Sequence, residues 1–136
     1  MAAGKPLLYV VDSSIIISHL LPDESLPRSI ESIIEKFVRH QADFVAPVLL
    51  RYEIGNVLKS AVKQKRLSPE DAQRIYSTFQ DSDIHYLSPN YPNTLQISLE
   101  HNLSFYDASY LCLAREKHAK LLTLDKKLST LSLRTK

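Results

Sequence analysis

The sequence predicts an α/β fold, in which a mostly parallel sheet of four strands carries helices on both faces. Four short apolar runs with the pattern of strands are separated by segments in which apolar residues recur at helical spacing. This alternation is typical of parallel sheets, because a helix must return the chain to the edge where the next strand starts. Length and composition agree, since 136 residues with 44% hydrophobic and 24% charged side chains suit one globular domain over residues 1–136.

The expected elements follow one another along the chain. Strands are expected at 6–11, 43–47, 83–88 and 119–124. Helices are expected at 13–21, 25–41, 48–67, from 69 onward, 91–102 and 104–119. Local signals support several helix starts, because proline suits a first turn and serine suits an N-cap. These starts are marked by Pro47, Ser68 with Pro69, and Ser104.

Composition argues against several kinds of site and location. The single cysteine, Cys112, cannot form an internal disulfide, and the five histidines are not spaced as zinc ligands. The apolar runs are too short to span a membrane and the N-terminus lacks the layout of a signal peptide, so a cytoplasmic location without membrane contact is expected. A net charge of +2 is compatible with nucleic-acid binding without indicating it.

Four acidic residues lie where apolar segments end or where an apolar residue is expected. Asp12 and Asp125 each follow an apolar strand, at the carboxyl edge of the sheet where open α/β folds bind ligands. Glu53 and Asp107 interrupt the apolar stripes of two helices. Partly buried carboxylates are costly unless a cation joins them, so together they predict a metal centre.

Helix capping is an alternative explanation for three of these acids. Asp12 or Asp125 could cap the helix that follows it, and Ser104 with Asp107 has the spacing of a capping box. Glu53 fits this explanation less well, because it lies well inside its helix. Capping alone would leave unexplained why all four acids converge on one edge of the sheet.

Four segments resemble the motifs of PIN-domain ribonucleases, in particular the VapC toxins of toxin–antitoxin pairs: VVDSSIII, RYEIGNVL, LSFYDASYLCLA and LLTLDKKL. The resemblance spans nearly the whole chain and implies a three-layer α/β/α PIN-like fold. It implies that Asp12, Glu53 and Asp107 are the core acidic ligands and that Asp125 is a more variable fourth. The hydroxyls of Ser14 and Thr123 match positions that support the acids.

The chain also departs from the pattern of this family in two places. Members often continue past the last acid into a further short strand, whereas this chain ends LSTLSLRTK, so four strands are expected and a fifth remains open. Asn102 stands where relatives often have glycine. Asparagine tolerates the left-handed backbone conformation, so we expect the turn before YDA to be retained.

The donor set indicates the class of metal. Carboxylates without histidine suit a hard cation, Mg²⁺ or Mn²⁺. The implied reaction is hydrolysis of RNA phosphodiester bonds, with the cation activating water and screening negative charge. Asp12 and Asp107 are expected as the main ligands, Glu53 as a direct or water-mediated ligand, and Asp125 as holder of a second ion or of the attacking water.

Other residues are assigned to the surroundings of the acids. Asn56 shares a helical face with Glu53, and Arg51, Lys126 and Lys127 are candidates for contacts with the RNA backbone. The resemblance also implies a homodimer and a small antitoxin in a groove beside the site, with the apolar face of 15–21 and the third helix with its partner as candidate walls.

Three other functions are alternatives to this hypothesis. A phosphoacceptor signalling domain would have paired acids after the first strand and a lysine after the last, but VVDSS offers one acid. A D-x-D phosphatase is disfavoured because Ser14 occupies the second acidic position. A catalytically silent PIN-like module that binds RNA or protein stays open, although the presence of all four acids argues against it.

Overall fold

The structure, a computed structural model, describes residues 6–133 and contains a parallel four-stranded sheet. The strands are β1 (Leu7–Val11), β2 (Ala42–Ala46), β3 (His85–Tyr86) and β4 (Lys120–Leu122), in the spatial order β3-β2-β1-β4. Every neighbouring pair is parallel. The prediction of an α/β fold with a parallel sheet is therefore confirmed.

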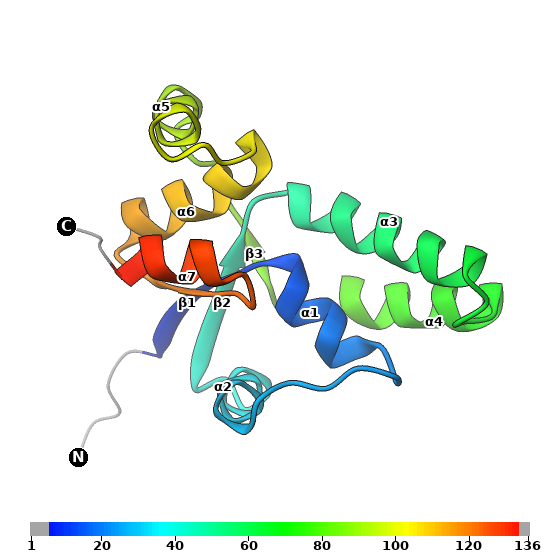
Figure 1. The fold of residues 1–136 in the computed structure, drawn as a ribbon. Coiled ribbons are helices and arrows are strands. Elements are labelled where there is room, and N and C mark those ends of the chain that lie inside the picture. Colours follow the sequence, from blue (N-terminus) through cyan, green and yellow to red (C-terminus); the bar gives the residue numbers. More distant parts are fainter. Residues whose placement is uncertain (1–5, 134–136) are drawn as a thin grey trace, which may run out of the picture.

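Helices connect the strands and cover both faces of the sheet (Figure 1). In the described residues they are α1 (Ser13–Leu20), α2 (Arg28–Val38), α3 (Leu49–Lys63), α4 (Pro69–Gln80), α5 (Tyr91–His101), α6 (Phe105–Lys117) and α7 (Lys126–Leu133). The first two helices lie on one side of the sheet and α5 and α6 on the other, while α3 and α4 form a hairpin that projects beyond it (Figure 1).

Strand β1 lies at the centre of the sheet and its carboxyl end is fixed from both sides. Its partners are β2, with Leu7 opposite Ala42, and β4, with Val11 opposite Leu122. Parallel strands enclosed by helices must be apolar throughout, and LLYVV meets this requirement, since its last three residues are buried. Residues that directly follow β1 and β4 are consequently held side by side.

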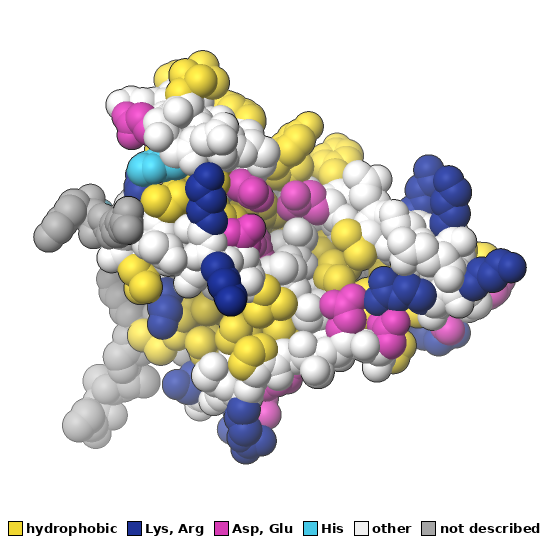
Figure 2. All heavy atoms as spheres, viewed as in Figure 1, with side chains coloured by type: hydrophobic (Ala, Val, Ile, Leu, Met, Phe, Trp, Pro, Cys, Tyr) yellow, Lys and Arg dark blue, Asp and Glu magenta, His cyan; other side chains and the backbone are white. Residues whose placement is uncertain are grey.

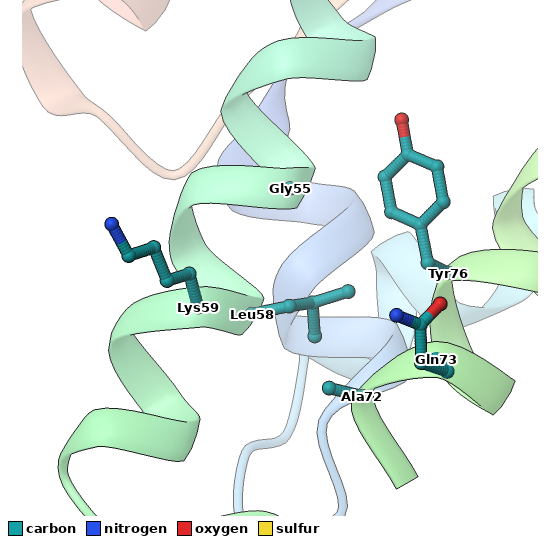
Figure 3. Close-up of a pocket in the computed structure, with 6 residues that line it drawn as sticks. All are labelled: Gly55, Leu58, Lys59, Ala72, Gln73 and Tyr76. Carbon is teal, nitrogen blue, oxygen red and sulfur yellow. The ribbon is translucent and has the colours of Figure 1, made fainter. Parts of the chain in front are cut away.

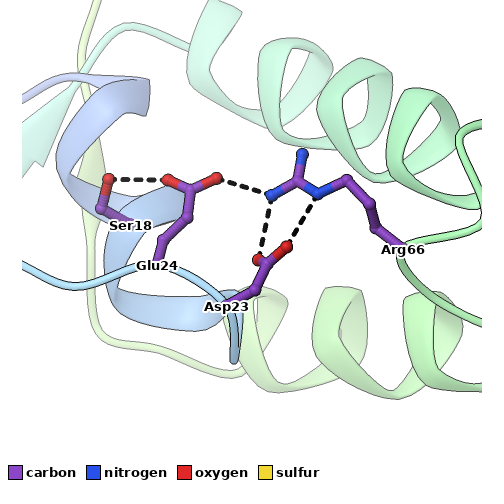
Figure 4. Close-up of polar contacts among 4 residues, drawn as sticks. All are labelled: Ser18, Asp23, Glu24 and Arg66. Atoms are coloured by element: carbon purple, nitrogen blue, oxygen red, sulfur yellow. Dashed lines mark hydrogen bonds and ion pairs between the residues drawn. The ribbon is translucent and has the colours of Figure 1, made fainter.

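The hairpin of α3 and α4 is held together by aromatic packing and by an ion-pair network. Tyr76 of α4 lies against Gly55 of α3 (Figure 3). Its hydroxyl donates to the backbone oxygen of Arg51 over 2.8 Å. At the far end, Arg66 donates to Asp23 and Glu24 at 2.9 Å, which ties the hairpin turn to the loop after α1 (Figure 4).

The segment after Asp125 is a helix rather than a fifth strand, as far as the structure describes it. Leu128 and Leu131 of α7 are buried against the core, which follows the helical spacing of its apolar residues. Strand β3 is shorter than predicted, because it is an edge strand with β2 as its partner and forms only two residue pairs. No helix among residues 6–133 has both the length and the apolar character needed to cross a membrane.

Candidate active site

Asp12 lies at the carboxyl end of β1 and is only 6% exposed. Its Oδ1 accepts hydrogen bonds from the backbone N–H and the hydroxyl of Ser14, at 3.0 and 2.6 Å. The Ser14 hydroxyl in turn accepts the backbone N–H of Leu124 at 3.0 Å, and Thr123 also bonds the Asp12 carboxylate. Asp12 thus caps α1, as the local explanation predicted, and is also held in place from the β4 end.

Burial raises the pKa of Asp12 above its ordinary value, and the hydrogen bonds from Ser14 and Thr123 oppose that rise. Desolvation therefore outweighs hydrogen bonding at this carboxylate. A cation at this position would reverse the effect, because opposite charge favours the ionised form.

Glu53 faces the sheet edge from α3 and is held by α6. The hydroxyl of Tyr110, a residue only 1% exposed, donates to Glu53 Oε1 over 2.5 Å, and Ser13 also bonds the carboxylate. Burial raises the pKa of Glu53, and the charges of Asp12 and Asp107 raise it further. Glu53 therefore interacts electrostatically with both of the acids predicted to accompany it.

Asp107 and Asp125 form the more open side of the acidic cluster. Asp107 lies in the first turn of α6, where its backbone N–H donates to the Ser104 hydroxyl at 3.0 Å. Burial, followed by the charge of Asp125, raises the pKa of Asp107. Asp125 is exposed and its Oδ1 accepts the backbone N–H of Leu128 at 2.9 Å, so it does cap α7.

The four acids are arranged as neighbouring electrostatic pairs along the sheet edge. Figure 2 shows acidic side chains gathered between α6 and α3, with basic side chains beside them over α7. Among residues 6–133, however, no three His, Cys, Asp or Glu side chains are grouped closely enough to hold one metal ion together. The four predicted ligands therefore lie along one edge of the sheet, but the structure does not bring three of them together.

The chemistry of this donor set fits a hard divalent cation. All four side chains offer carboxylate oxygens, which Mg²⁺ and Mn²⁺ prefer. The pKa values of Asp12, Glu53 and Asp107 are raised by burial, and within the described chain no lysine or arginine is among the causes of these shifts. The assignment of the four acids as ligands stays a prediction that this electrostatic pattern favours.

The remaining predicted residues are placed differently from one another. Lys127 donates to the backbone oxygen of Asn102 at 3.3 Å, so it bridges α7 to the turn before α6, and Lys126 is exposed next to it. Asn56 is exposed one turn after Glu53. Arg51 instead lies over the ring of Tyr86, 4.2 Å from its centroid, and is not brought together with the acids in the described structure.

Two partners of Glu53 were missed in the sequence. Neither Tyr110 nor Ser13 is among the site residues that the sequence predicts. A signal was available for Tyr110, because a buried tyrosine hydroxyl usually has a hydrogen-bond partner. Its partner, however, lies 57 residues away in the chain, so no local pattern could identify it.

A family model matches most of the chain. The model of the PIN domain matches residues 9–132, which include all four acids, strands β2, β3 and β4, and the last three residues of β1. The chain belongs to the PIN-domain family. This PIN domain is similar to curated proteins with VapC names. It is 27% identical to Ribonuclease VapC3 of Pyrobaculum aerophilum over 124 residues, which cover 88% of this chain and 91% of that protein.

Further relatives extend this similarity. Ribonuclease VapC1 of Mycobacterium tuberculosis is 36% identical over 90 residues, which cover 62% of this chain and 64% of that protein. Exonuclease VapC9 of P. aerophilum is 28% identical over 108 residues, which cover 79% and 81%. The resemblance to PIN-domain and VapC proteins is therefore confirmed.

Two solved structures share the fold of this PIN domain. One is the PAE2754 protein of P. aerophilum, with a TM-score of 0.72, 24% identity and coverage of 94% of each chain. The other is the sarcin–ricin-loop-cleaving toxin VapC20 of M. tuberculosis, with a TM-score of 0.62 and 12% identity, covering 90% of this chain and 94% of that one. These likenesses support the three-layer PIN fold.

Proposed function

We propose that the protein is a Mg²⁺- or Mn²⁺-dependent endoribonuclease and the toxin of a VapBC-type toxin–antitoxin pair, acting on RNA in the cytoplasm. The observation that carries this proposal is that Asp12, Glu53, Asp107 and Asp125 lie along the carboxyl edge of a PIN-domain sheet and interact electrostatically as neighbours. Three of these acids have pKa values raised by burial. Relatives named as VapC ribonucleases support the choice of RNA as substrate.

The chain's own residues orient the acids and bind the substrate backbone. Ser14 and Thr123 fix the carboxylate of Asp12, and Tyr110 fixes that of Glu53. Asp107 stands on the first turn of α6, facing Asp125 across the more open side. The exposed ammonium groups of Lys126 and Lys127 would attract RNA phosphates toward acids that would otherwise repel them.

A divalent cation bound by these carboxylates would supply charge neutralisation at the phosphate and a more acidic water for in-line attack. Asp12 and Asp107 would be its main ligands. Glu53, held by Tyr110, would contact the ion directly or through water. Asp125 would hold a second ion or orient the attacking water.

Cleavage assays test this proposal. Purified protein, free of antitoxin, would be incubated with linear single-stranded, hairpin and covalently closed circular RNA, with Mn²⁺, Mg²⁺ or a chelator. We expect metal-dependent cutting of the circle, which has no end for an exonuclease. Asp12→Asn and Asp107→Asn should each abolish it, whereas Asp43→Asn, at the opposite end of the sheet, should not. Cleavage in chelator, or in both active-site variants, would contradict the mechanism.

We propose that the antitoxin covers the apolar cavity of about 170 Å³ between α1, α2 and α4. Its walls include Ile16, Leu20 and Phe37, and Val38 at its rim is largely exposed. The walls from α1 and α4 belong to the expected groove, whereas α2 takes the place of α3. Val38→Asp should weaken binding of a cognate antitoxin, without reducing RNA cleavage.

We also propose a homodimer that uses the outer face of α5. Leu95 and Leu99 lie one turn apart and are 51% and 75% exposed, which is unusual for two leucines on one face of a helix. Sedimentation should give twice the mass of the chain, and Leu99→Glu should shift it toward the monomer. A monomeric wild-type protein would remove the basis for this assignment.

A silent RNA-binding module is the second candidate. It is favoured by the absence, within residues 6–133, of a group of three acids ready to hold one ion, and by the capping role of Asp125. This alternative predicts RNA binding that metal does not alter and no cleavage of any probe, an outcome that the same assays would report.

A further inference from the structure

An uncharged aromatic cavity of about 190 Å³ opens between the start of α3 and the starts of α5 and α6. Its walls include Val48, Leu49, Tyr91, Phe105, Tyr106 and Ser109. No charged side chain lines it in the described structure. Such a cavity suits a neutral, largely apolar group and does not suit a phosphate.

This cavity adjoins the acidic cluster through two helices. Leu49 lies one turn before Glu53 on α3, and Tyr106 lies one turn before Tyr110 on α6, so each pair shares a helical face. The second members of these pairs, Glu53 and Tyr110, are hydrogen-bonded to each other. The cavity wall therefore continues directly into the acidic site, and Tyr106 immediately precedes Asp107.

The rings at the cavity are presented to solvent. Tyr91, Phe105 and Tyr106 are 54%, 41% and 60% exposed. Much of the apolar surface of each ring is therefore still available for contact with a ligand. Tyr91 and Phe105 are close to parallel, with 21° between their planes and 6.3 Å between centroids. Exposed aromatic faces of this kind are the usual platforms on which proteins stack the bases of single-stranded nucleic acid.

Charge is distributed as a single strand of RNA would require. The aromatic cavity lies at the starts of α3, α5 and α6, and Lys126 and Lys127 begin the helix that follows Asp125, with Lys127 bonded to the turn between α5 and α6. A strand crossing the acids could place a base in the neutral cavity and neighbouring phosphates near the lysines. A protein partner is the alternative occupant of an exposed apolar cavity. RNA binding and sedimentation of the same variants distinguish a nucleobase from a protein in this cavity.

We propose that this cavity is a nucleobase subsite, which stacks the base of a nucleotide next to the scissile phosphate on Tyr106 and its aromatic neighbours. The inference rests on the proposed cleavage of RNA and adds a substrate class to it, namely single-stranded RNA with an unpaired base at the cut. It also assigns Tyr106 a positioning role, because the ring would place the phosphate without taking part in the chemistry.

The test compares two RNA probes on four proteins. The probes are a short oligoadenosine strand and a strand of equal length in which abasic nucleotides replace the adenosines. The proteins are the full chain, Tyr106→Leu, Tyr106→Phe and Tyr52→Leu, each carrying Asp12→Asn so that binding is measured without cleavage. Tyr52 is an exposed tyrosine next to Glu53 that does not line the cavity, so it is a matched control.

We expect Tyr106→Leu to bind oligoadenosine about tenfold more weakly, within the range of base stacking on an aromatic ring. Its affinity for the abasic strand should be unchanged, and Tyr106→Phe and Tyr52→Leu should match the parent protein on both strands. Equal losses on both strands would mean that Tyr106 acts on the acids and would overturn the inference. A loss in Tyr52→Leu as large as that in Tyr106→Leu would overturn it too.

Cleavage and sedimentation distinguish a failure of the base subsite from a failure of the proposed nuclease function. If the protein with all four acids cleaves RNA while Tyr106→Leu binds and cleaves like it, the nuclease stands and the base subsite falls. If no probe is cleaved, the proposed function fails, while the difference between the two strands still tests the cavity. Sedimentation of Tyr106→Leu should leave the mass unchanged, and a loss of mass would identify the cavity as a contact between copies.

Discussion

The tyrosine that holds Glu53 has a role that its burial alone would not require. The hydroxyl of a buried tyrosine could donate its hydrogen bond to any acceptor. The hydroxyl of Tyr110 donates to the carboxylate of Glu53, which lies near other carboxylates. Burial and the charge of Glu53 raise the pKa of Tyr110, so its hydroxyl remains a donor. The bond fixes the orientation of the Glu53 carboxylate, which is the role expected of Tyr110 if Glu53 binds a cation as proposed.

Tyr110→Phe should therefore lower the rate of RNA cleavage about 10- to 100-fold, the usual cost of losing a hydrogen bond to a metal ligand. The fold should persist, because phenylalanine keeps the ring in the core. Cleavage rates at saturating Mn²⁺, with circular dichroism of each variant, would measure both effects. Tyr9→Phe makes the same substitution in the core and should cleave at the wild-type rate, and equal rates for both variants would contradict the assigned role.

The three raised pKa values predict how stability varies with pH when divalent cations are removed. Asp12, Glu53 and Asp107 hold protons more tightly in the folded than in the unfolded chain. The stability they contribute is present below the ordinary pKa values of 3.8 and 4.5 and is lost as pH rises through the folded values. Global stability has other contributions, so the comparison must isolate one acid.

The variant Asp12→Asn isolates the contribution of Asp12 to this pH dependence, because asparagine resembles the protonated acid and does not titrate. In chelator, this variant should exceed the wild type in Tm at neutral pH, and the difference should shrink as pH falls toward 4. Melting curves of both proteins across this range would measure it. A difference that does not vary with pH would mean that Asp12 keeps an ordinary pKa in the folded protein.

At the scale of elements, helices with strong local signals were predicted well. The serine caps at 68 and 104 and the left-handed backbone of Asn102, with φ 52°, agree with the sequence. Strand β3 was predicted too long, because strand length depends on partners that lie elsewhere in the chain. The acids themselves could be found from helical and strand spacing, but the bond between Glu53 and Tyr110 joins two helices and has no local signature.

The interior of α3 contains a glycine that the structure does not require. Gly55 has no positive φ, and an added Cβ would lie 3.7 Å from a ring carbon of Tyr76, which is ordinary van der Waals contact. Gly55→Ala should therefore stabilise the protein by about 0.4–1 kcal/mol, through helix propensity and a less flexible unfolded chain. Urea denaturation would measure the gain. A loss of stability would mean that Tyr76 cannot adjust (Figure 3).

At the scale of the whole molecule, the sheet collects negative charge from distant parts of the chain. The strand order places the ends of β1 and β4 side by side, and α3 and α6, which start near this edge, each carry a further acid (Figure 1). The backbone N–H of Asp12 donates to the oxygen of Leu122 at 3.2 Å, so this edge is fixed by the fold itself. The repulsion among its carboxylates is thus a property of the native state and is relieved on unfolding.

Addition of Mn²⁺ should consequently raise the Tm of the native protein. An ion that binds the folded chain alone stabilises it by about 2.7 kcal/mol at 100 times its Kd, which corresponds to several degrees for a domain of this size. Because ligand carboxylates must be ionised, the increase should be smaller near pH 4 than at pH 7. Calorimetry with and without Mn²⁺ would measure it. Asp107→Asn should reduce the increase and Asp43→Asn should retain it, whereas an equal increase in both variants would place the bound ion away from these acids.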